Sequence, residues 1–413
     1  MKSKINYKLT DIAFISFYCI DLIKLVLINI LGNNIYAKSI IPTIFVYLIL
    51  ILGIVKEKKK IKVDTILLLM GILILFVASG IVFPENIFAM LELETWNSLE
   101  CVFTLTGGIF AYAFFRLIDD PKRLYRNLNI SSFLLFFWCA IRIVSSLQKG
   151  GFNKMNVNGI ASVSTYDMTV GYRLLFCSII FSINYFKLHK NRILNLLMAG
   201  ISFILMIIYG SRTAVASYIL FLVLFSIFCD DFSNKTKKNK FKVIFIFLIL
   251  VLTYVILFCT DFLKDIYSFL IQHNFNSRIL NTLINGSELD IGRTKMWTKS
   301  IELIKSNWVI GLGIYSDRTA FNIYCHQILL EIYLDFGIII GTIIILYLIK
   351  NIYTMFFKCK NEYFKMIFII FFSLSFIRLN LSSSFWQDIN FWASIAIYIS
   401  YRKTERRRIK YGE

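Results

Sequence analysis

The sequence predicts an all-α protein that crosses a membrane many times, and three observations predict it. Of its 413 residues, 58% are hydrophobic and only 17% are charged, and the mean hydropathy is +0.69. The apolar residues come in long blocks, close to the roughly 20 residues that cross about 30 Å of hydrocarbon. Basic residues gather between these blocks. Since a helix satisfies its own backbone hydrogen bonds in lipid, we expect the blocks to be helices.

Twelve such blocks follow one another without a repeat or a flexible linker between them, so we predict one polytopic domain over residues 1–413. The first block has no small-residue cleavage site and more blocks follow it, which indicates a retained span. The predicted spans are residues 10–31, 39–55, 63–83, 101–118, 129–147, 168–187, 192–209, 212–229, 241–260, 325–349, 364–381 and 385–401.

The basic residues predict the orientation of these spans. With the N-terminus inside, the inner segments hold 30 Lys and Arg residues and the short outer loops hold five. Such an asymmetry is typical of the cytoplasmic side of membrane proteins. We therefore expect both termini in the cytoplasm. The same asymmetry accounts for most of the net charge of +20, so the charge predicts no nucleic-acid partner.

One outer loop, residues 261–324, is much longer than the others, and loops of that length are usually functional or disordered. Within it, Trp297, Ile301, Ile304 and Trp308 recur at helical spacing, which predicts an amphipathic helix. We expect this helix to lie on the membrane surface or to cap the helical bundle. The glycines of the GLG sequence at 311–313 are expected to end it.

Arginines on the outer side are candidate phosphate ligands. Arg212 opens a predicted span after Ser211, a plausible N-cap, so its guanidinium would stand beside a positive helix end. Arg293 would begin the amphipathic helix after Asp290. Each has a plainer alternative, because Arg212 could reach up to lipid head groups and Arg293 could be a solvated surface residue.

Further candidates lie inside or beside the predicted spans. Arg173 lies one and a half turns inside a span, where it faces a wet cavity or pairs with an acid such as Asp167 or Asp388. His326 lies where the long loop re-enters the membrane, and its imidazole suits proton transfer near neutral pH, or it is a satisfied interfacial histidine. Glu331 lies about 140° around the helix from His326, which argues against a His–Glu dyad. Glu331 shares its face with Gln327 instead and could bind substrate or stabilise the fold. Arg142 and Arg378 are expected to be structural or to reach up to the lipid head groups.

Three stretches of sequence together resemble a known family. They are GSRTA at residues 210–214, GRTKMWTKSIELIKSNWVIGLG, and YCHQILLEIYLDFGIIIG. Their order and spacing, from about Arg173 to Gly341, resemble the O-antigen ligase and polysaccharide polymerase superfamily. The closest resemblance is to Wzy-type polymerases of capsule or exopolysaccharide clusters, through SDR at 316–318 and the HQILLEIYLDFG form. Gln327 departs from the usual Asn, but it can make the same amide hydrogen bonds.

The resemblance implies an enzyme of the bacterial cytoplasmic membrane that works on its outer face. Such enzymes transfer a growing glycan from undecaprenyl diphosphate to an acceptor sugar on a second lipid, without a metal or other cofactor. A chain-length regulator is a further expected partner. The resemblance implies that Arg212 and Arg293, with Arg173, hold the diphosphate, and that His326 activates the acceptor hydroxyl. It makes Arg318 and Arg278 weaker candidates for the second diphosphate.

Two other functions stay open at this stage. A ligase of the same superfamily would move finished glycan to a different acceptor, and the sequence separates the two poorly. A flippase for lipid-linked oligosaccharides would also need many spans and buried charges. Flippases usually have two similar halves, and the sequence shows no internal repeat.

Overall fold

The computed structural model describes residues 7–32, 34, 36–90, 108–149, 151–155, 161–164, 166–188, 191–229, 260–272, 280, 284 and 291–411. These residues form two compact units. Unit 1 comprises residues 1–131, 291–375 and 379–413, and unit 2 comprises residues 132–290 and 376–378. The prediction of one polytopic domain stays a prediction.

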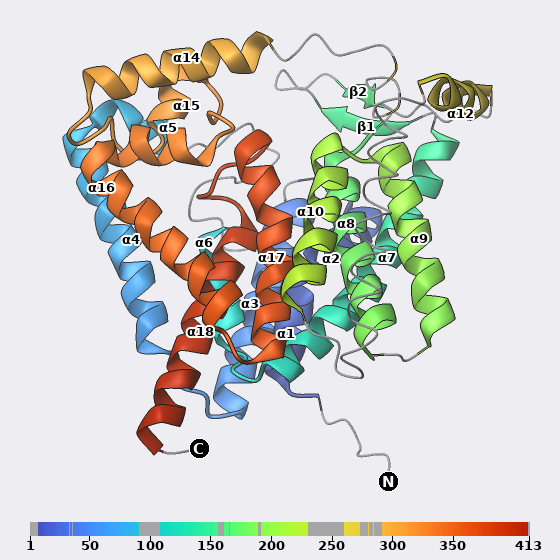
Figure 1. Ribbon diagram of the computed structural model, residues 1–413, viewed down its shortest axis with the longest axis horizontal. Coiled ribbons are helices and arrows are strands. Elements are labelled where there is room, and N and C mark those ends of the chain that lie inside the picture. The colour runs from blue at the N-terminus through green and yellow to red at the C-terminus, as the bar shows by residue number, and fades with distance from the viewer. Residues whose placement is uncertain are drawn as a thin grey trace. The chain divides into compact units, whose positions relative to one another are not determined.

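Unit 1 is built from helices that both ends of the chain supply. Its N-terminal helices are α1 (Leu9–Tyr18), α2 (Ile20–Leu31), α3 (Ile41–Lys56), α4 (Val63–Val82), α5 (Ile87–Met90), α6 (Ile109–Arg116) and the start of α7 (Pro121–Gln148). Its C-terminal helices are α14 (Ile291–Ser306), α15 (Ser316–Phe321), α16 (Ile328–Tyr353), most of α17 (Glu362–Leu381), and α18 (Ile389–Tyr411). The short helix α15 lies beside α5, near one end of α4, and α14 packs against α16 (Figure 1).

Unit 2 is a smaller helical group. It holds the rest of α7, then α8 (Met168–Ile183), α9 (Arg192–Tyr209), α10 (Arg212–Phe228) and α12 (Thr260–Gln272). The helices α8, α9 and α10 run side by side (green in Figure 1). A short antiparallel hairpin, β1 (Phe152–Met155) and β2 (Ala161–Ser164), follows α7. Among the described residues, the all-α prediction is confirmed apart from this hairpin, which was not predicted.

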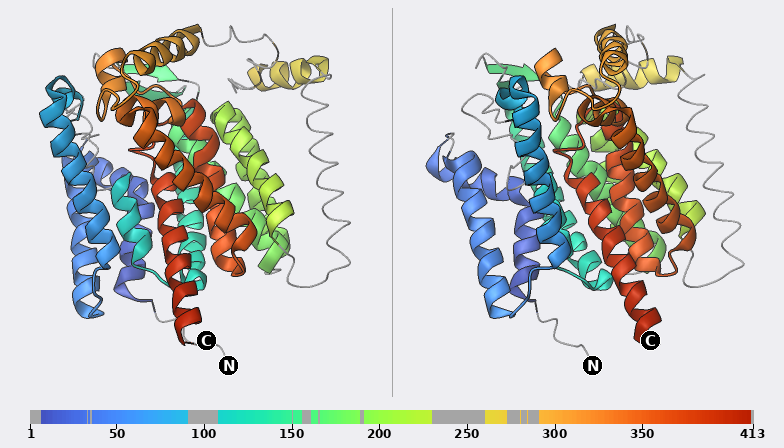
Figure 2. Two further views of the ribbon diagram at one scale, coloured as in Figure 1. Left: turned by 60° about the vertical axis from the view of Figure 1, so that its left-hand side comes forward. Right: turned by 90° about the vertical axis from the view of Figure 1, so that its left-hand side faces the viewer.

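Six helices among the described residues are long and apolar enough to cross a membrane. They are α4, α7, α8 with its π-helical extension to Lys187, α9, α16 with its extension to Lys358, and α17. A seventh span is possible if α1 and α2, which meet at a bend of 74°, count as one (Figure 2). The predicted span 241–260 lies almost wholly outside the described residues, so the count of twelve stays a prediction.

The apolar helices turn much of their surface outward. In α4, Leu67 is 66% exposed and Ile81 is 75% exposed, and only 17% of the apolar window of this helix is buried. Long helices with exposed apolar faces are typical of proteins that lie in lipid. The protein is therefore a membrane protein.

Candidate functional site

A cluster of buried charges joins α15 to α16 within unit 1. Arg318 donates from Nη1 to Oδ1 of Asp317 at 2.7 Å and to Oε1 of Glu331 at 3.0 Å. Asp317, Arg318 and Glu331 are 0%, 5% and 1% exposed. Burying charges is costly unless they are paired and hydrogen-bonded, and here they are both. We call Asp317, Arg318, Glu331 and the neighbouring Asp335 the α15–α16 charge cluster.

The same cluster anchors the turn that joins α17 to α18. Glu331 accepts a hydrogen bond from the Ser384 hydroxyl and another from the backbone N–H of Phe385 at 3.2 Å. Asp335, one helical turn further along α16, accepts from Nε1 of Trp386 at 2.7 Å. Glu331 therefore carries the structural role that the sequence left open beside substrate binding.

Arg318 is held in its charged form. Its guanidinium lies 3.9 Å from the centre of the Tyr315 ring and 5.6 Å from that of Tyr324. Burial disfavours the charged form, but the Asp317 and Glu331 carboxylates outweigh burial and raise the pKa of Arg318 well above its usual value. This engagement fits a structural residue better than a ligand of a second diphosphate, the role that the sequence motif suggested.

His326 stands in a strained backbone conformation between two fixed neighbours. Its φ is 58°, in the left-handed region that only a few per cent of non-glycine residues adopt. The peptide groups of Cys325 are held on both sides, because its N–H donates to Oδ2 of Asp317 at 2.9 Å and its carbonyl accepts from Nε1 of Trp297 at 2.9 Å. The imidazole is partly exposed, and its ring centre lies 4.3 Å from that of Tyr324.

Gln327 fixes the other side of His326. It is the N-cap of α16, and its Oε1 accepts from the backbone N–H of Leu330 at 2.6 Å. This cap satisfies one of the free N–H groups that every helix start leaves. The family's usual Asn could make the same bond, so the departure at Gln327 preserves the cap. Strain of this kind persists only where the surroundings enforce it, and it gathers at functional sites.

The helix α14 places Trp297 against Cys325, directly before His326. Ile304 is buried against Cys325 and Leu334, whereas Ile301 and Trp308 are 45% and 54% exposed. One part of the predicted apolar face of α14 therefore packs against the protein, and the other part is exposed. Arg293, near the start of α14, is half-buried, and its proposed cap at Asp290 lies outside the described residues.

The turn after α14 fits into a break in α16. Gly337 has a φ of 69° inside this helix, and the break leaves the carbonyl of Leu334 and the N–H of Ile338 without helical partners. The backbone of the turn supplies them, since Leu312 N donates to Leu334 O and Ile338 N donates to Trp308 O, each at 2.7 Å. A Cβ on Gly337 would lie 2.3 Å from the carbonyl oxygen of Val309, so the contact requires glycine.

In unit 2, Arg173 and Arg212 flank one contact between α8 and α10. Tyr172, next to Arg173, shares a hydrogen bond of 2.6 Å with Thr213, next to Arg212. Ser211 caps α10 as predicted, accepting from the N–H of Ala214 at 3.4 Å. Arg212 is exposed and Arg173 is half-buried. These two predicted phosphate ligands therefore lie at the same end of unit 2.

Two more arginines lie at this end of unit 2, as structural residues. Arg142 pairs with Asp167 at 3.1 Å, and Asp167 in turn caps α8 through the N–H groups of Thr169 and Val170. The guanidinium of Arg378 lies 4.5 Å from the centre of the Tyr172 ring. Both findings agree with the structural roles predicted for Arg142 and Arg378.

Sequence reasoning missed most of the charge cluster's partners. Ser384 and Trp386 carry no motif, and only the SDR motif hinted at Asp317. Arg278, a predicted ligand, lies outside the described residues. Within the described residues, no group of three or more His, Cys, Asp or Glu side chains is arranged to hold a metal ion.

Comparison with known protein families matches a part of the chain that contains several of the residues described above. Residues 197–346 match the model of the O-antigen ligase family. This part of the chain is similar to the O-antigen ligase family. This segment includes Arg212, Arg293 and His326, together with Asp317, Arg318 and Glu331 of the charge cluster, whereas Arg173 and the 382–388 turn lie beyond it. The match to this family supports the interpretation that the protein is a membrane enzyme of the ligase or polymerase type, which acts on lipid-linked polysaccharide. No curated protein and no solved structure matches the chain.

Proposed function

We propose that this protein polymerises oligosaccharide repeat units carried on undecaprenyl diphosphate, at the outer face of the bacterial cytoplasmic membrane. The observation that carries the proposal is the position of His326. It is a strained, partly exposed histidine inside the O-antigen ligase segment, and hydrogen bonds fix the residues on either side of it. An imidazole held in this way is ready to accept a proton.

The proposed reaction is a glycosyl transfer. The acceptor sugar hydroxyl attacks the anomeric carbon of the donor glycan, a new glycosidic C–O bond forms, and the bond from that carbon to the diphosphate oxygen breaks. Undecaprenyl diphosphate leaves with the bonding electrons. The hydroxyl proton passes to His326, which we assign as the general base.

In the proposed reaction, the arginines stabilise the negative charge that develops on the leaving diphosphate. Arg212 with Arg173, and Arg293 near the start of α14, can each grip phosphate oxygens through paired N–H donors. Such preorganised donors stabilise a departing anion more than they stabilise the bound substrate. Arg212 is also the first residue of α10, so the positive end of that helix adds to its charge.

The charge distribution supports the proposed orientation. With 30 Lys and Arg residues on one predicted side and five in the short loops of the other, both termini would be cytoplasmic. The motifs around Arg212 and His326 would then be extracytoplasmic, where lipid-linked repeat units await polymerisation.

A ligase is the second candidate, and the description of the matching family favours it. The two are separated by incubating purified protein with a lipid-linked repeat unit as the sole substrate. A polymerase makes a ladder of lengths on undecaprenyl diphosphate. A ligase makes no ladder and transfers glycan only when a different acceptor lipid is added. Absence of new glycosidic bonds with every acceptor would contradict both.

A further inference from the structure

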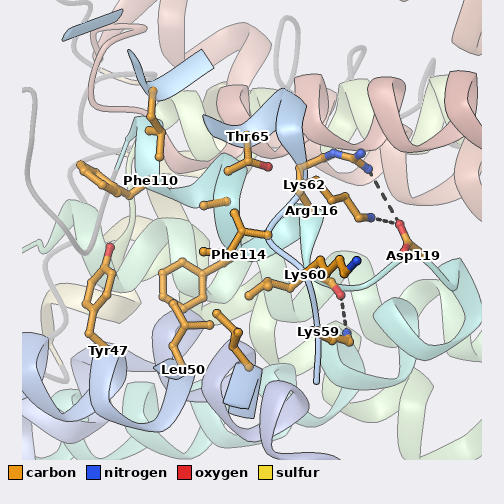
Figure 3. A pocket seen from close by; sticks show the side chains of 15 residues that line it. Tyr47, Leu50, Lys59, Lys60, Lys62, Thr65, Phe110, Phe114, Arg116 and Asp119 are labelled. Atoms are coloured by element: carbon orange, nitrogen blue, oxygen red, sulfur yellow. Dashed lines mark hydrogen bonds and ion pairs between the residues drawn. The ribbon is translucent and has the colours of Figure 1, made fainter. Parts of the chain in front are cut away.

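Unit 1 contains a cavity of about 340 Å³ that no step of the proposed reaction uses. It lies where α3, the start of α4 and α6 meet (Figure 3). Its inner wall is apolar and includes Leu50 of α3 with Phe110 and Phe114 of α6. Its mouth is formed by the short connection between α3 and α4 and by the end of α6. We call it the α3–α6 pocket.

The mouth of the α3–α6 pocket is basic. Lys59, Lys60, Lys62 and Arg116 line it against one acidic residue, Asp119. Arg116 is committed to Asp64, with Nε 2.8 Å from the carboxylate, and Lys62 pairs with Asp119. Lys59 donates to a neutral group, the carbonyl of Leu117, at 2.6 Å, and Lys60 is exposed at the rim. The pocket therefore presents net positive charge.

The pKa values of two of these lysines reflect the same excess of positive charge. Burial, followed by the positive charge of Arg116, lowers the pKa of Lys62 to about 7, although the Asp64 carboxylate acts in the opposite direction. Burial, followed by Arg123, also lowers the pKa of Lys59. An anion at the mouth would favour the charged form of both lysines.

The depth of the pocket suits the head group of a lipid. The helix α3 ends at Lys56 and the membrane-spanning helix α4 begins at Val63, so the basic residues stand where the apolar segments stop. The apolar wall continues from there between the helices. A cavity with cations at the head-group level and rings and aliphatic chains below it matches an amphiphile with an anionic head.

We propose that the α3–α6 pocket binds an anionic phospholipid, with its phosphate at Lys59 and Lys60 and an acyl chain against Leu50 and Phe114. The pocket is remote from the His326 segment. It lies at the Val63 end of α4, whereas Ser79 near the other end accepts a hydrogen bond of 2.9 Å from the N–H of Ile314, in the turn before α15. Sixteen residues of helix separate Val63 from Ser79, which is about 24 Å.

The test is native mass spectrometry of the full-length protein, purified with mixed phosphatidylglycerol and phosphatidylcholine. We expect the wild type to retain phosphatidylglycerol selectively. The double variant Lys59→Gln/Lys60→Gln should retain it less, by about fivefold for each lysine. Lys56→Gln/Lys58→Gln is the matched control, because it removes two exposed lysines of the same region that do not line the pocket.

A second variant tests the apolar wall. Ala113→Phe places a ring in the pocket and keeps all four cations, so it should also lose phosphatidylglycerol. Equal losses in the Lys59/Lys60 and Lys56/Lys58 pairs, or full retention by Ala113→Phe, would overturn the proposal. A polyprenyl phosphate that displaces phosphatidylglycerol at lower concentration would reassign the pocket to the carrier lipid. All of these are binding measurements without sugar substrate, so they stand apart from the proposed glycosyl transfer.

Discussion

The carboxylate of Asp317 accepts a hydrogen bond of 2.9 Å from the backbone N–H of Cys325, the residue directly before His326. The same carboxylate is paired with Arg318, which is paired with Glu331 on α16. The α15–α16 charge cluster therefore bears on the backbone of the proposed general base. One effect of the cluster is therefore to fix the backbone directly before His326.

Removing the Trp297 clamp should slow the reaction. Trp297→Phe keeps a ring but loses the N–H that donates to the Cys325 carbonyl, and an unsatisfied carbonyl costs about 1–3 kcal/mol. We expect kcat to fall about tenfold with little change in KM, because substrate binding does not use this bond. Polymer synthesis by purified protein measures both. Trp308→Phe, at an exposed tryptophan of the same segment, should leave kcat unchanged.

Neutralising Glu331 should destabilise the fold. Glu331→Gln removes the carboxylate that Arg318, Ser384 and Phe385 all contact, and breaking a buried ion pair costs about 3–5 kcal/mol. The midpoint of thermal unfolding in detergent should drop by several degrees. Glu302→Gln, an exposed charge on α14, is the control. If both variants unfold at the wild-type temperature, the cluster does not stabilise unit 1.

The break in α16 should tolerate no side chain. In Gly337→Ala, the backbone at φ 69° and ψ 179° is in a region that essentially only glycine adopts, which costs about 1–3 kcal/mol, and the clash of the new Cβ with the Val309 carbonyl adds to it. We expect lower yield and a lower unfolding temperature. Gly71→Ala is the matched control, because that glycine is in the middle of α4 with nothing within 4 Å of an added Cβ. Equal stability of the two variants would show that the turn does not depend on this contact.

Much of this fold could be predicted from hydropathy, because a long apolar stretch of sequence identifies a membrane helix. The described helices α4, α9 and α17 begin and end close to the predicted spans. The caps at Ser211 and Gln327 follow from local sequence, although only the first was predicted. The contacts of Glu331 with Ser384 and Phe385 join residues 53 and 54 positions apart, and no local pattern encodes them. The division of the α14 face was equally hidden, since it depends on where Cys325 and Leu334 come to lie.

Arg212 should require its guanidinium and not only its charge. Arg212→Lys keeps the charge but loses the paired donors, so we expect kcat/KM to fall at least about tenfold. The control is Arg192→Lys. Arg192 is exposed like Arg212, but it is the first residue of α9, whereas Arg212 follows the last residue of that helix. Similar losses in both variants would point to a general effect of surface charge, contrary to specific phosphate binding.

In the proposed reaction, His326 takes the proton from the acceptor hydroxyl. The most direct test of this step is the length distribution of glycan made from a lipid-linked repeat unit by purified wild-type protein and by His326→Ala at equal folded concentration. If His326 is the general base, the wild type makes a ladder of polymer lengths and His326→Ala leaves the repeat units unextended. A ladder of wild-type length and rate from His326→Ala would contradict this role.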